Sequence, residues 1–441
     1  MKKLLTKEFL LVIICMGAFV LLGLRNDSNA PALDKNIYKG IKTFNEVFDM
    51  VQKNYVDEVS STTLIQGAIN GMVKSLDPHS SFMTPDLYKE LEVETQGAFG
   101  GIGIEITILK DILTIVSPIE DTPAFVAGIK PGDQILRIDG KSTKDITVME
   151  AVKKLRGPKD TKVTITIMRE KMSTPKDIVL TRAIIQIKSI KVKNFEDNIG
   201  YIRIAAFQER TADDLSKALK EISKKLNPMK GLVLDLRNDP GGLLNQAIEV
   251  SDMFLKSGII VSTRGRAKNM ETKATAKDDG NEITCPIVVL VNEGTASAAE
   301  IVAGALQDNG RALIIGTQTF GKASVQTVIP LEDGSALKLT TARYYTPKGR
   351  SIQAEGIKPD IIVKYIRPTA EDAENTAWWE DRVKEKDLKG HIKPAKEDGT
   401  KIDEPQTPEV KDPSDLVNDK QLKTAIDILK GWDIMKKNLN S

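Results

Sequence analysis

The chain has 441 residues, of which 41% are apolar and 28% are charged, and its net charge is +2. This composition indicates a globular protein of two to three domains and excludes a disordered chain. Basic and acidic residues are interspersed and the sequence has no phosphate-binding glycine motif, so we expect neither a nucleic-acid partner nor a nucleotide, and we predict no cofactor and no metal.

The N-terminus has the layout of an export signal. Lysines near Met1 precede an apolar run over residues 9–24, which ends at Arg25. The run is slightly short for a membrane span, and residues 29–32 offer a cleavage site, so residues 1–29 are either a signal peptide or an uncleaved membrane anchor. We therefore expect an exported protein of the periplasm or cell envelope, with anchoring to the inner membrane left open.

Residues 30–96 have helical periodicity. Apolar side chains recur at helical spacing over residues 44–55 and again over residues 64–72, and Pro85 begins a third helix after a threonine cap. The apolar faces of the first two helices need a partner, which is either their own chain or a second copy. We interpret His79, which precedes the third helix, as structural.

A glycine loop follows in residues 97–182. Its residues Gly101, Ile102, Gly103 and Ile104 present consecutive N–H groups that can bind a terminal carboxylate. The adjoining strand edge can accept an extended peptide. The loop therefore predicts a site for peptide or protein C-termini.

A helix on the far side of this region completes the predicted groove. Residues 147–150 form a capping box, and Val148 and Val152 lie one turn apart on the helix that it begins. We expect these two valines to line the peptide groove. Arg156 ends the helix.

Residues 190–365 alternate between strand and helix patterns. This alternation predicts an α/β core with a largely parallel sheet. The expected strands are 199–204, 231–236, 287–291 and 313–315, and the expected helices are 213–226 and 243–254.

Two segments of this core offer a serine nucleophile and a lysine base without a histidine. Residues 292–300 contain Ser297 at the expected N-terminus of a helix, and residues 321–326 contain Lys322. A neutral lysine amine can take the proton of a serine hydroxyl if burial lowers its pKa. The N–H of Ala298, in the first turn of the helix, can bind the oxyanion of a tetrahedral intermediate.

A second oxyanion donor is expected where the strand over residues 233–237 ends. The glycines that follow, Gly241 and Gly242, let the main chain approach a bound carbonyl oxygen, and the choice between them is open. Asp239 lies just before them, and a carboxylate beside a developing oxyanion would oppose it.

The last part of the chain, residues 366–441, changes character. Residues 366–415 are rich in Glu, Lys, Asp and Pro, which predicts a loosely packed segment. Apolar residues from Leu422 to Leu429 then predict a final amphipathic helix.

Taken together, these segments resemble the carboxyl-terminal processing peptidases, also called tail-specific proteases, whose usual patterns are close to L-R-x-N-P-G-G, G-S-A-S-A-S-E and F-G-K-G-x-V-Q. The resemblance implies that Ser297 is the nucleophile, Lys322 the general base, and Gln326 the residue that orients the lysine. Gln326 shares a side with Lys322 if the segment is helical, but the residues after it favour a strand. Asp239, where the family has Asn, is the departure of most concern, and Thr295 and Ala323 also depart.

Further resemblances imply the fold. Residues 97–182, with an Ala-Gly-Ile-Lys-Pro-Gly-Asp run beyond the glycine loop, resemble a PDZ domain, and the family's protease core is similar to the crotonase and Clp protease sheets. The expected fold is therefore multidomain α+β and α/β, with an N-terminal helical region, a PDZ domain, a protease core and a C-terminal helical extension. The family also implies homo-oligomer formation through residues 30–96.

We predict an exported serine endopeptidase that captures protein C-termini through its PDZ domain and cleaves through a Ser-Lys dyad. Ligand capture by the PDZ domain would permit Lys322 to reach Ser297, with Arg156 as a contact in that switch and a regulatory adaptor protein as a further partner. The alternatives are a non-catalytic PDZ scaffold and an acyl-CoA enzyme; export argues against the latter because coenzyme A chemistry is cytosolic.

Overall fold

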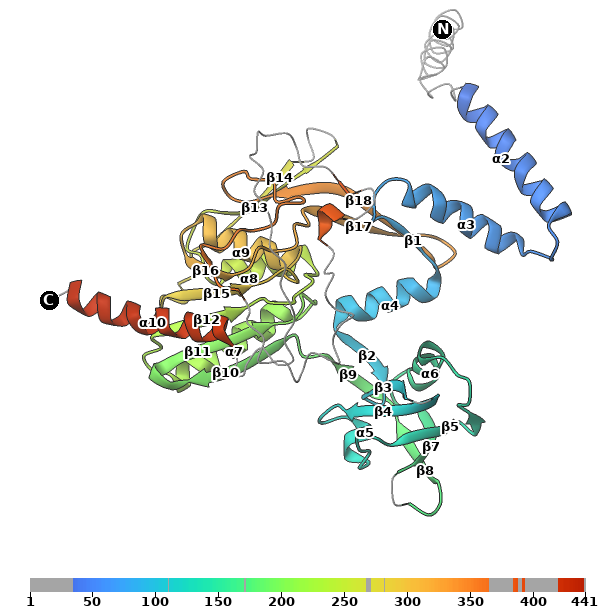
Figure 1. The fold of residues 1–441 in the computed structure, drawn as a ribbon, viewed down its shortest axis with the longest axis horizontal. Coiled ribbons are helices and arrows are strands. Elements are labelled where there is room, and N and C mark those ends of the chain that lie inside the picture. The colour runs from blue at the N-terminus through green and yellow to red at the C-terminus, as the bar shows by residue number, and fades with distance from the viewer. Residues whose placement is uncertain are drawn as a thin grey trace, which may run out of the picture. The chain divides into compact units, whose positions relative to one another are not determined.

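The computed structural model describes residues 35–109, 111–169, 172–266, 271–280, 282–364, 384–387, 391–392 and 419–439. The predicted export signal lies outside these residues, as does nearly all of the charged segment 366–415. The chain forms two compact units, one ending at Met72 and the other beginning at Val73 (Figure 1). None of the described helices is long and apolar enough to cross a membrane.

The first unit consists of α2 (Lys35–Asn54) and most of α3 (Ser61–Lys74). Both helices occur where the apolar periodicity predicts them. In α2 the rings of Phe44 and Phe48 stack, with centroids 6.4 Å apart. Most of the large apolar side chains of α2 are exposed within this unit, and they include Ile37, Tyr38, Ile41, Phe44, Val47 and Met50.

The second unit begins with β1 (Ser81–Met83) and α4 (Pro85–Gln96). Pro85 occupies the first turn of α4, where its missing N–H costs nothing, and Gly97 ends the helix with a φ of 66°. The strand β1 was not predicted, because three residues are too few to show an alternating pattern.

A small β-domain follows. Its six-stranded sheet has the order β3-β4-β5-β7-β8 with β6 paired to β5, and β3 is an edge strand. Alternate residues of the strands, such as Leu113, Ile135 and Ile165, form a separate apolar core with α5 and α6. The elements are β3 (Ile104–Leu109), β4 (Ile112–Pro118), α5 (Pro123–Val126), β5 (Gln134–Ile138), β6 (Lys141–Ser142), α6 (Val148–Leu155), β7 (Lys162–Met168) and β8 (Lys176–Thr181). A two-stranded ribbon of β2 (Ala98–Gly101) and β9 (Ala183–Gln186) lies at its two chain ends.

The centre of the larger domain is a six-stranded sheet of order β10-β11-β12-β15-β16-β19. All its pairs are parallel except β10 with β11, in line with the predicted largely parallel sheet. Both faces of β12 and β15 are buried, which explains their unbroken apolar sequences. The strands are β10 (Ile190–Phe195), β11 (Ile199–Ile204), β12 (Gly231–Asp235), β15 (Ile287–Val291), β16 (Ala312–Gly316) and β19 (Ile361–Ile362).

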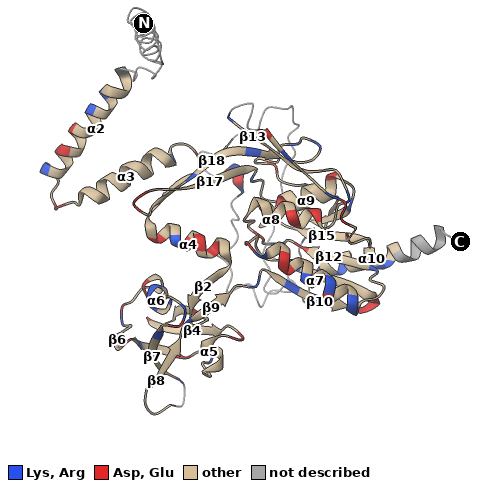
Figure 2. Ribbon diagram, turned by 180° about the vertical axis from the view of Figure 1, so that it is seen from behind, with Lys and Arg blue, Asp and Glu red and all other residues tan. Residues whose placement is uncertain are grey.

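Helices cover both faces of this sheet (Figure 1). On one face α7 (Thr211–Lys225), α8 (Leu244–Asp252) and α9 (Ala298–Asp308) pack on residues such as Leu234 and Val289. On the other face, Leu422, Ala425 and Leu429 of α10 (Lys420–Leu439) pack on strand residues such as Val233 and Val288, whose side chains point away from α7, α8 and α9. Figure 2 shows both signs of charge along α7, with acidic residues in its first turn and basic residues in its last, which complements the helix dipole.

A second, antiparallel sheet adjoins the α9 side and was not predicted. Its order is β1-β18-β13-β14, and β17 also pairs with β18. The strands are β13 (Ile259–Gly265), β14 (Glu271–Thr275), β17 (Ser324–Pro330) and β18 (Ala336–Tyr345). Because β17 begins two residues after Lys322, this sheet positions the lysine.

Candidate active site

Ser297 lies at the N-terminus of α9, where the sequence predicts a helix start. Its φ and ψ are 55° and −115°, a conformation that residues other than glycine rarely adopt. The loop before it is held at the carboxyl ends of β12 and β15: Thr295 Oγ1 donates to the Leu236 carbonyl at 2.8 Å, and the Ala296 N–H donates to the Asp239 carbonyl at 2.9 Å. A strained backbone that is held this firmly is typical of functional sites.

Glu300, which is fully buried, connects the serine to the lysine. Its Oε2 accepts the N–H of Ser297 and the N–H of Lys322, both at 2.9 Å. Its Oε1 accepts the N–H of Gly321 at 2.8 Å and the hydroxyl of Thr319 at 2.5 Å. Burial raises the pKa of Glu300 to about 7, against the opposing effect of these four donors.

Tyr344 makes a second connection between the same two residues. Its buried hydroxyl donates to the carbonyl of Ser297 at 3.0 Å and is shared with the carbonyl of Lys322. The main chains of Ser297 and Lys322 are therefore joined through both their N–H and their C=O groups. The sequence places these residues 25 positions apart, and the fold brings them together.

The Lys322 side chain is half-buried in surroundings that favour its neutral form. Burial lowers the pKa of Lys322, and the like charge of Lys338 adds to this effect. The carboxylates of Glu385, Glu300 and Asp77 oppose it. Among the contacts of the described residues, no hydrogen bond joins Lys322 Nζ to Ser297 Oγ.

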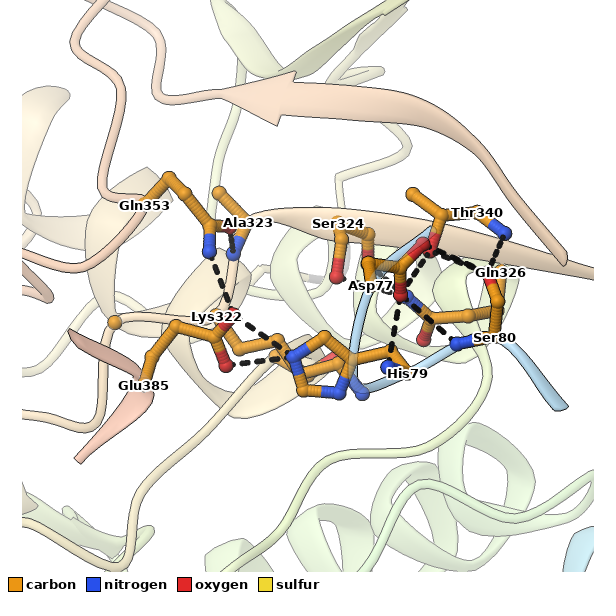
Figure 3. A network of polar contacts seen from close by, with 12 residues as sticks. Asp77, His79, Ser80, Lys322, Ala323, Ser324, Gln326, Thr340, Gln353 and Glu385 are labelled. Atoms are coloured by element: carbon orange, nitrogen blue, oxygen red, sulfur yellow. Dashed lines mark hydrogen bonds and ion pairs between the residues drawn. The ribbon is translucent and has the colours of Figure 1, made fainter. Parts of the chain in front are cut away.

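Gln326 lies on β17, so the segment has the strand conformation and not the helical one (Figure 3). Its Nε2 donates to Ser324 Oγ at 2.8 Å and to the Ser324 carbonyl at 3.3 Å. In this conformation Gln326 therefore contacts the residue two positions after Lys322 rather than the lysine itself.

The two glycines predicted as oxyanion donors lie against the serine loop. A Cβ on Gly241 would lie 2.8 Å from the amide nitrogen of Ala298 and from Ser297 Cβ, and Gly241 has a φ of 97°. The Gly241 N–H already donates to Asp239 Oδ1 at 2.8 Å. The N–H groups of Gly242 and Ala298 have no hydrogen-bond partner in the described part of the chain.

Asp239 is completely buried beneath this loop. Burial raises the pKa of its carboxyl well above the usual range, with Asp235 acting in the same direction and Arg203 and the Gly241 N–H opposing. Its Oδ2 has no hydrogen-bond partner among the described residues. Burial thus favours the neutral acid, and a neutral acid opposes an oxyanion far less than a carboxylate does.

The predicted peptide-binding residues lie around the edge strand of the small β-domain. Gly101 ends β2 and Ile104 begins β3, while the Ile102 side chain is buried in the domain core and leaves only its main chain for a ligand. Gly103 has a φ of 78°, and a Cβ there would lie 2.3 Å from Thr122. The N–H groups of Ile102 and Gly103 donate to no other described residue.

The helix α6 supplies the other predicted groove residues. The predicted capping box is present, since the Thr147 N–H donates to Glu150 and the Glu150 N–H donates to Thr147 Oγ1. On this helix Val148 is exposed and Val152 is half-buried. The Arg156 guanidinium lies 4.6 Å from the centre of the Phe99 ring on β2.

Some residues of the site were missed by the sequence analysis. Glu300 had a usable signal, because Ser-x-x-Glu before an apolar helix predicts that the serine N–H donates to the glutamate carboxylate. Tyr344, Gln353 and Glu385 had none, because they approach Lys322 from distant parts of the sequence. Within the described residues, no cluster of His, Cys, Asp and Glu could hold a metal ion.

Comparison with known proteins gives consistent matches along the chain. The peptidase family S41 matches residues 198–363, a PDZ domain matches residues 90–168, and the activating protease CtpB N-terminal domain matches residues 24–86. The chain is 47% identical over 400 residues to the carboxy-terminal-processing protease of Bartonella bacilliformis, with 90% of each chain covered. It is 37% identical over 336 residues to the carboxy-terminal processing protease CtpA of Bacillus subtilis, covering 75% of this chain and 71% of that one. A solved structure of the photosystem II D1 C-terminal processing protease is 31% identical, with a TM-score of 0.43 and with 73% of this chain and 92% of that chain covered.

Proposed function

The chain belongs to the carboxy-terminal processing proteases of peptidase family S41, and we propose that it is an exported serine endopeptidase that cleaves polypeptides through Ser297 and Lys322. The observation that carries this proposal is the double connection of the two main chains through Glu300 and Tyr344. It holds a serine in a strained conformation beside a lysine whose pKa is lowered by burial. This is the combination that a Ser-Lys reaction requires.

The reaction proceeds through an acyl-enzyme. Neutral Lys322 Nζ takes the hydroxyl proton of Ser297 while Oγ attacks the scissile carbonyl carbon. The N–H groups of Ala298 and Gly242 donate to the oxyanion, and the C–N bond then breaks as the protonated lysine gives its proton to the leaving amine. Water attacks the ester, Lys322 takes its proton, and the acyl group leaves as an acid that restores Ser297.

This reaction requires a movement of the Lys322 side chain. The main chains of Ser297 and Lys322 are connected, but their side chains make no hydrogen bond to each other. We propose that this movement is a rotation of the lysine side chain toward Ser297 Oγ. Peptide capture by the PDZ domain is the proposed trigger, and the Arg156–Phe99 contact between α6 and β2 is the proposed point of transmission.

Protein C-termini are the proposed ligands of the PDZ domain. An extended peptide can add to the free edge of β3, and its terminal carboxylate can accept the N–H groups of Ile102 and Gly103. Val148 and Val152 then border the groove from α6. Gly101 and Ile104 are the two ends of the loop. The backbone conformation between them determines whether the N–H groups of Ile102 and Gly103 both point at the ligand carboxylate.

The proposed location is the periplasm or cell envelope, supported by the sequence of residues 1–29. The exposed apolar side of α2 supports assembly into a homo-oligomer through the N-terminal region. A regulatory adaptor protein and the choice between a signal peptide and an inner-membrane anchor stay predictions from the sequence.

The proposal is tested by measuring cleavage of an unstructured polypeptide with a free C-terminus. Ser297→Ala protein should bind the substrate without cleaving it, whereas undiminished cleavage would rule out this nucleophile. Val148→Asp should weaken binding of the same C-terminal peptide, because it places a charge in the groove. Val179→Asp on β8, where the valine is 60% exposed, is the matched control and should bind normally.

A further inference from the structure

A buried carboxylate outside the proposed dyad lies beside Lys322. Glu385, in the short helix η4 (Glu385–Asp387), is 0% exposed. Its two oxygens lie 2.8 and 2.6 Å from His79 Nε2, and its Oε1 accepts Gln353 Nε2 at 2.7 Å (Figure 3). Burying a carboxylate costs free energy unless the group is paired, so its contacts with His79 and Gln353 are needed to keep it buried.

The contacts of Glu385 continue to the main chain of the lysine segment. Gln353 uses its amide nitrogen for Glu385 and its Oε1 to accept the N–H of Ala323 at 2.9 Å. Ala323 follows Lys322 directly. Glu385 therefore holds Gln353 in the orientation that fixes the start of β17, where the lysine projects (Figure 3).

Glu385 also acts on Lys322 through charge. It is the first of the negative groups that stabilise the protonated form of Lys322, ahead of Glu300 and Asp77. Lys338 on β18 acts in the opposite direction. His79 balances Glu385 only when its imidazole is protonated.

Building on the proposed Ser-Lys reaction, we propose that Glu385 is a positioning residue for Lys322. It anchors the lysine segment through Gln353 and places a carboxylate beside Lys322 (Figure 3). His79 completes the anchor by contacting Glu385. His79 and Glu385 therefore position Lys322, and neither of them acts as the base.

Two substitutions separate the charge from the anchor. Glu385→Gln removes the charge but keeps an oxygen to accept Gln353 and a nitrogen to donate to neutral His79. Glu385→Ala removes both. Glu355→Gln is the matched control, because it removes an exposed carboxylate two positions after Gln353.

The first measurement is the pH dependence of kcat/KM on an unstructured peptide. Glu385→Gln should shift the ascending limb to lower pH, so that the rate one unit below the wild-type midpoint rises roughly threefold or more. Glu355→Gln should match the wild type. Glu385→Ala should lose maximal rate that Glu385→Gln retains. Superimposed profiles for Glu385→Gln and Glu355→Gln would overturn the charge role, and equal maximal rates for Glu385→Ala and Glu385→Gln would overturn the anchor.

The second measurement does not depend on proteolysis. In a Ser297→Ala background, the pH dependence of acetic anhydride labelling at Lys322, read by mass spectrometry, reports the neutral fraction of this lysine. Glu385→Gln should move the labelling midpoint to lower pH, and an unchanged midpoint would contradict the inference. If the midpoint shifts but the protein that retains Ser297 cleaves no substrate, the proposed function is refuted and the inference about Glu385 stands.

Discussion

The main-chain N–H groups of Ser297 and Lys322 donate to the same carboxylate oxygen. Glu300 Oε2 accepts the N–H of each at 2.9 Å, and on the opposite side the Tyr344 hydroxyl contacts the carbonyl of each. The relative position of the two residues is thus set by buried hydrogen bonds of the main chain and not by contact between their side chains. These main-chain contacts leave the Lys322 side chain unconstrained.

Glu300 should make the protein less stable as pH rises, and the Glu300→Gln variant should lack this pH dependence. Its folded-state pKa is raised from 4.5 to about 7, so its contribution to stability is fully present below 4.5 and is lost as pH rises through 7. Relative to Glu300→Gln, the wild type should lose on the order of 2 kcal/mol of unfolding free energy between about pH 5 and about pH 8. Denaturant unfolding at both values measures this, and parallel pH trends in the two proteins would show that Glu300 is ionised throughout.

Gly241→Ala should abolish most activity through contact with the serine loop. The new Cβ would lie 2.8 Å from the Ala298 nitrogen and from Ser297 Cβ, so the oxyanion donors must shift. The expected loss in kcat is roughly a hundredfold. Gly349→Ala is the control, since Gly349 has a φ of 80° but nothing within 4 Å of the added Cβ. A comparable loss in both proteins would mean that general destabilisation, and not the contact, is responsible.

Asp239→Asn should preserve activity and extend it to higher pH. Asparagine keeps the oxygen that accepts the Gly241 N–H, and it cannot ionise beside the oxyanion. Because the folded-state pKa of Asp239 is raised, the wild type loses both stability and oxyanion binding as pH rises through it. The ratio of variant to wild-type kcat should therefore increase with pH. A ratio that stays flat up to alkaline pH would exclude ionisation of Asp239 as a cause.

Asp419→Ala should weaken the attachment of α10 to the core and lower the stability of the protein. Asp419 caps this helix through the Leu422 N–H at 3.0 Å, and it accepts Arg237 Nη1 at 3.0 Å. Arg237 is 2% exposed, so losing a partner costs about 3 kcal/mol even though Asp235 remains. Thermal unfolding measures the loss. Asp427→Ala removes an exposed carboxylate from the same helix and should unfold like the wild type.

The predicted family, the PDZ domain and the order of an N-terminal region, a PDZ domain and a protease core are confirmed. The family and the PDZ domain were predicted from a resemblance carried by short motifs, whereas individual elements were predicted from local signals: the unbroken apolar strand Leu232–Leu234, the capping box at Thr147, and a serine before an apolar helix. Such signals depend only on the burial and backbone preferences of residues that are close together in the sequence.

The antiparallel sheet and the surroundings of Lys322 could not be predicted in this way. The pairing of Ser81 with Lys338 joins residues far apart in the sequence, and nothing near either residue specifies the partner. Glu385 lies in a stretch whose charged composition indicates solvent exposure, yet its own side chain is buried by contacts from His79 and Gln353. Tertiary contacts override local composition at these positions.

The most direct test of the central claim is the cleavage rate of an unstructured polypeptide by Lys322→Ala protein that is shown to be folded. Removal of the only proposed base should lower kcat/KM by roughly a hundredfold or more while peptide binding by the PDZ domain stays unchanged. Cleavage at the wild-type rate would contradict the account, because Ser297 would then be activated by some group other than Lys322.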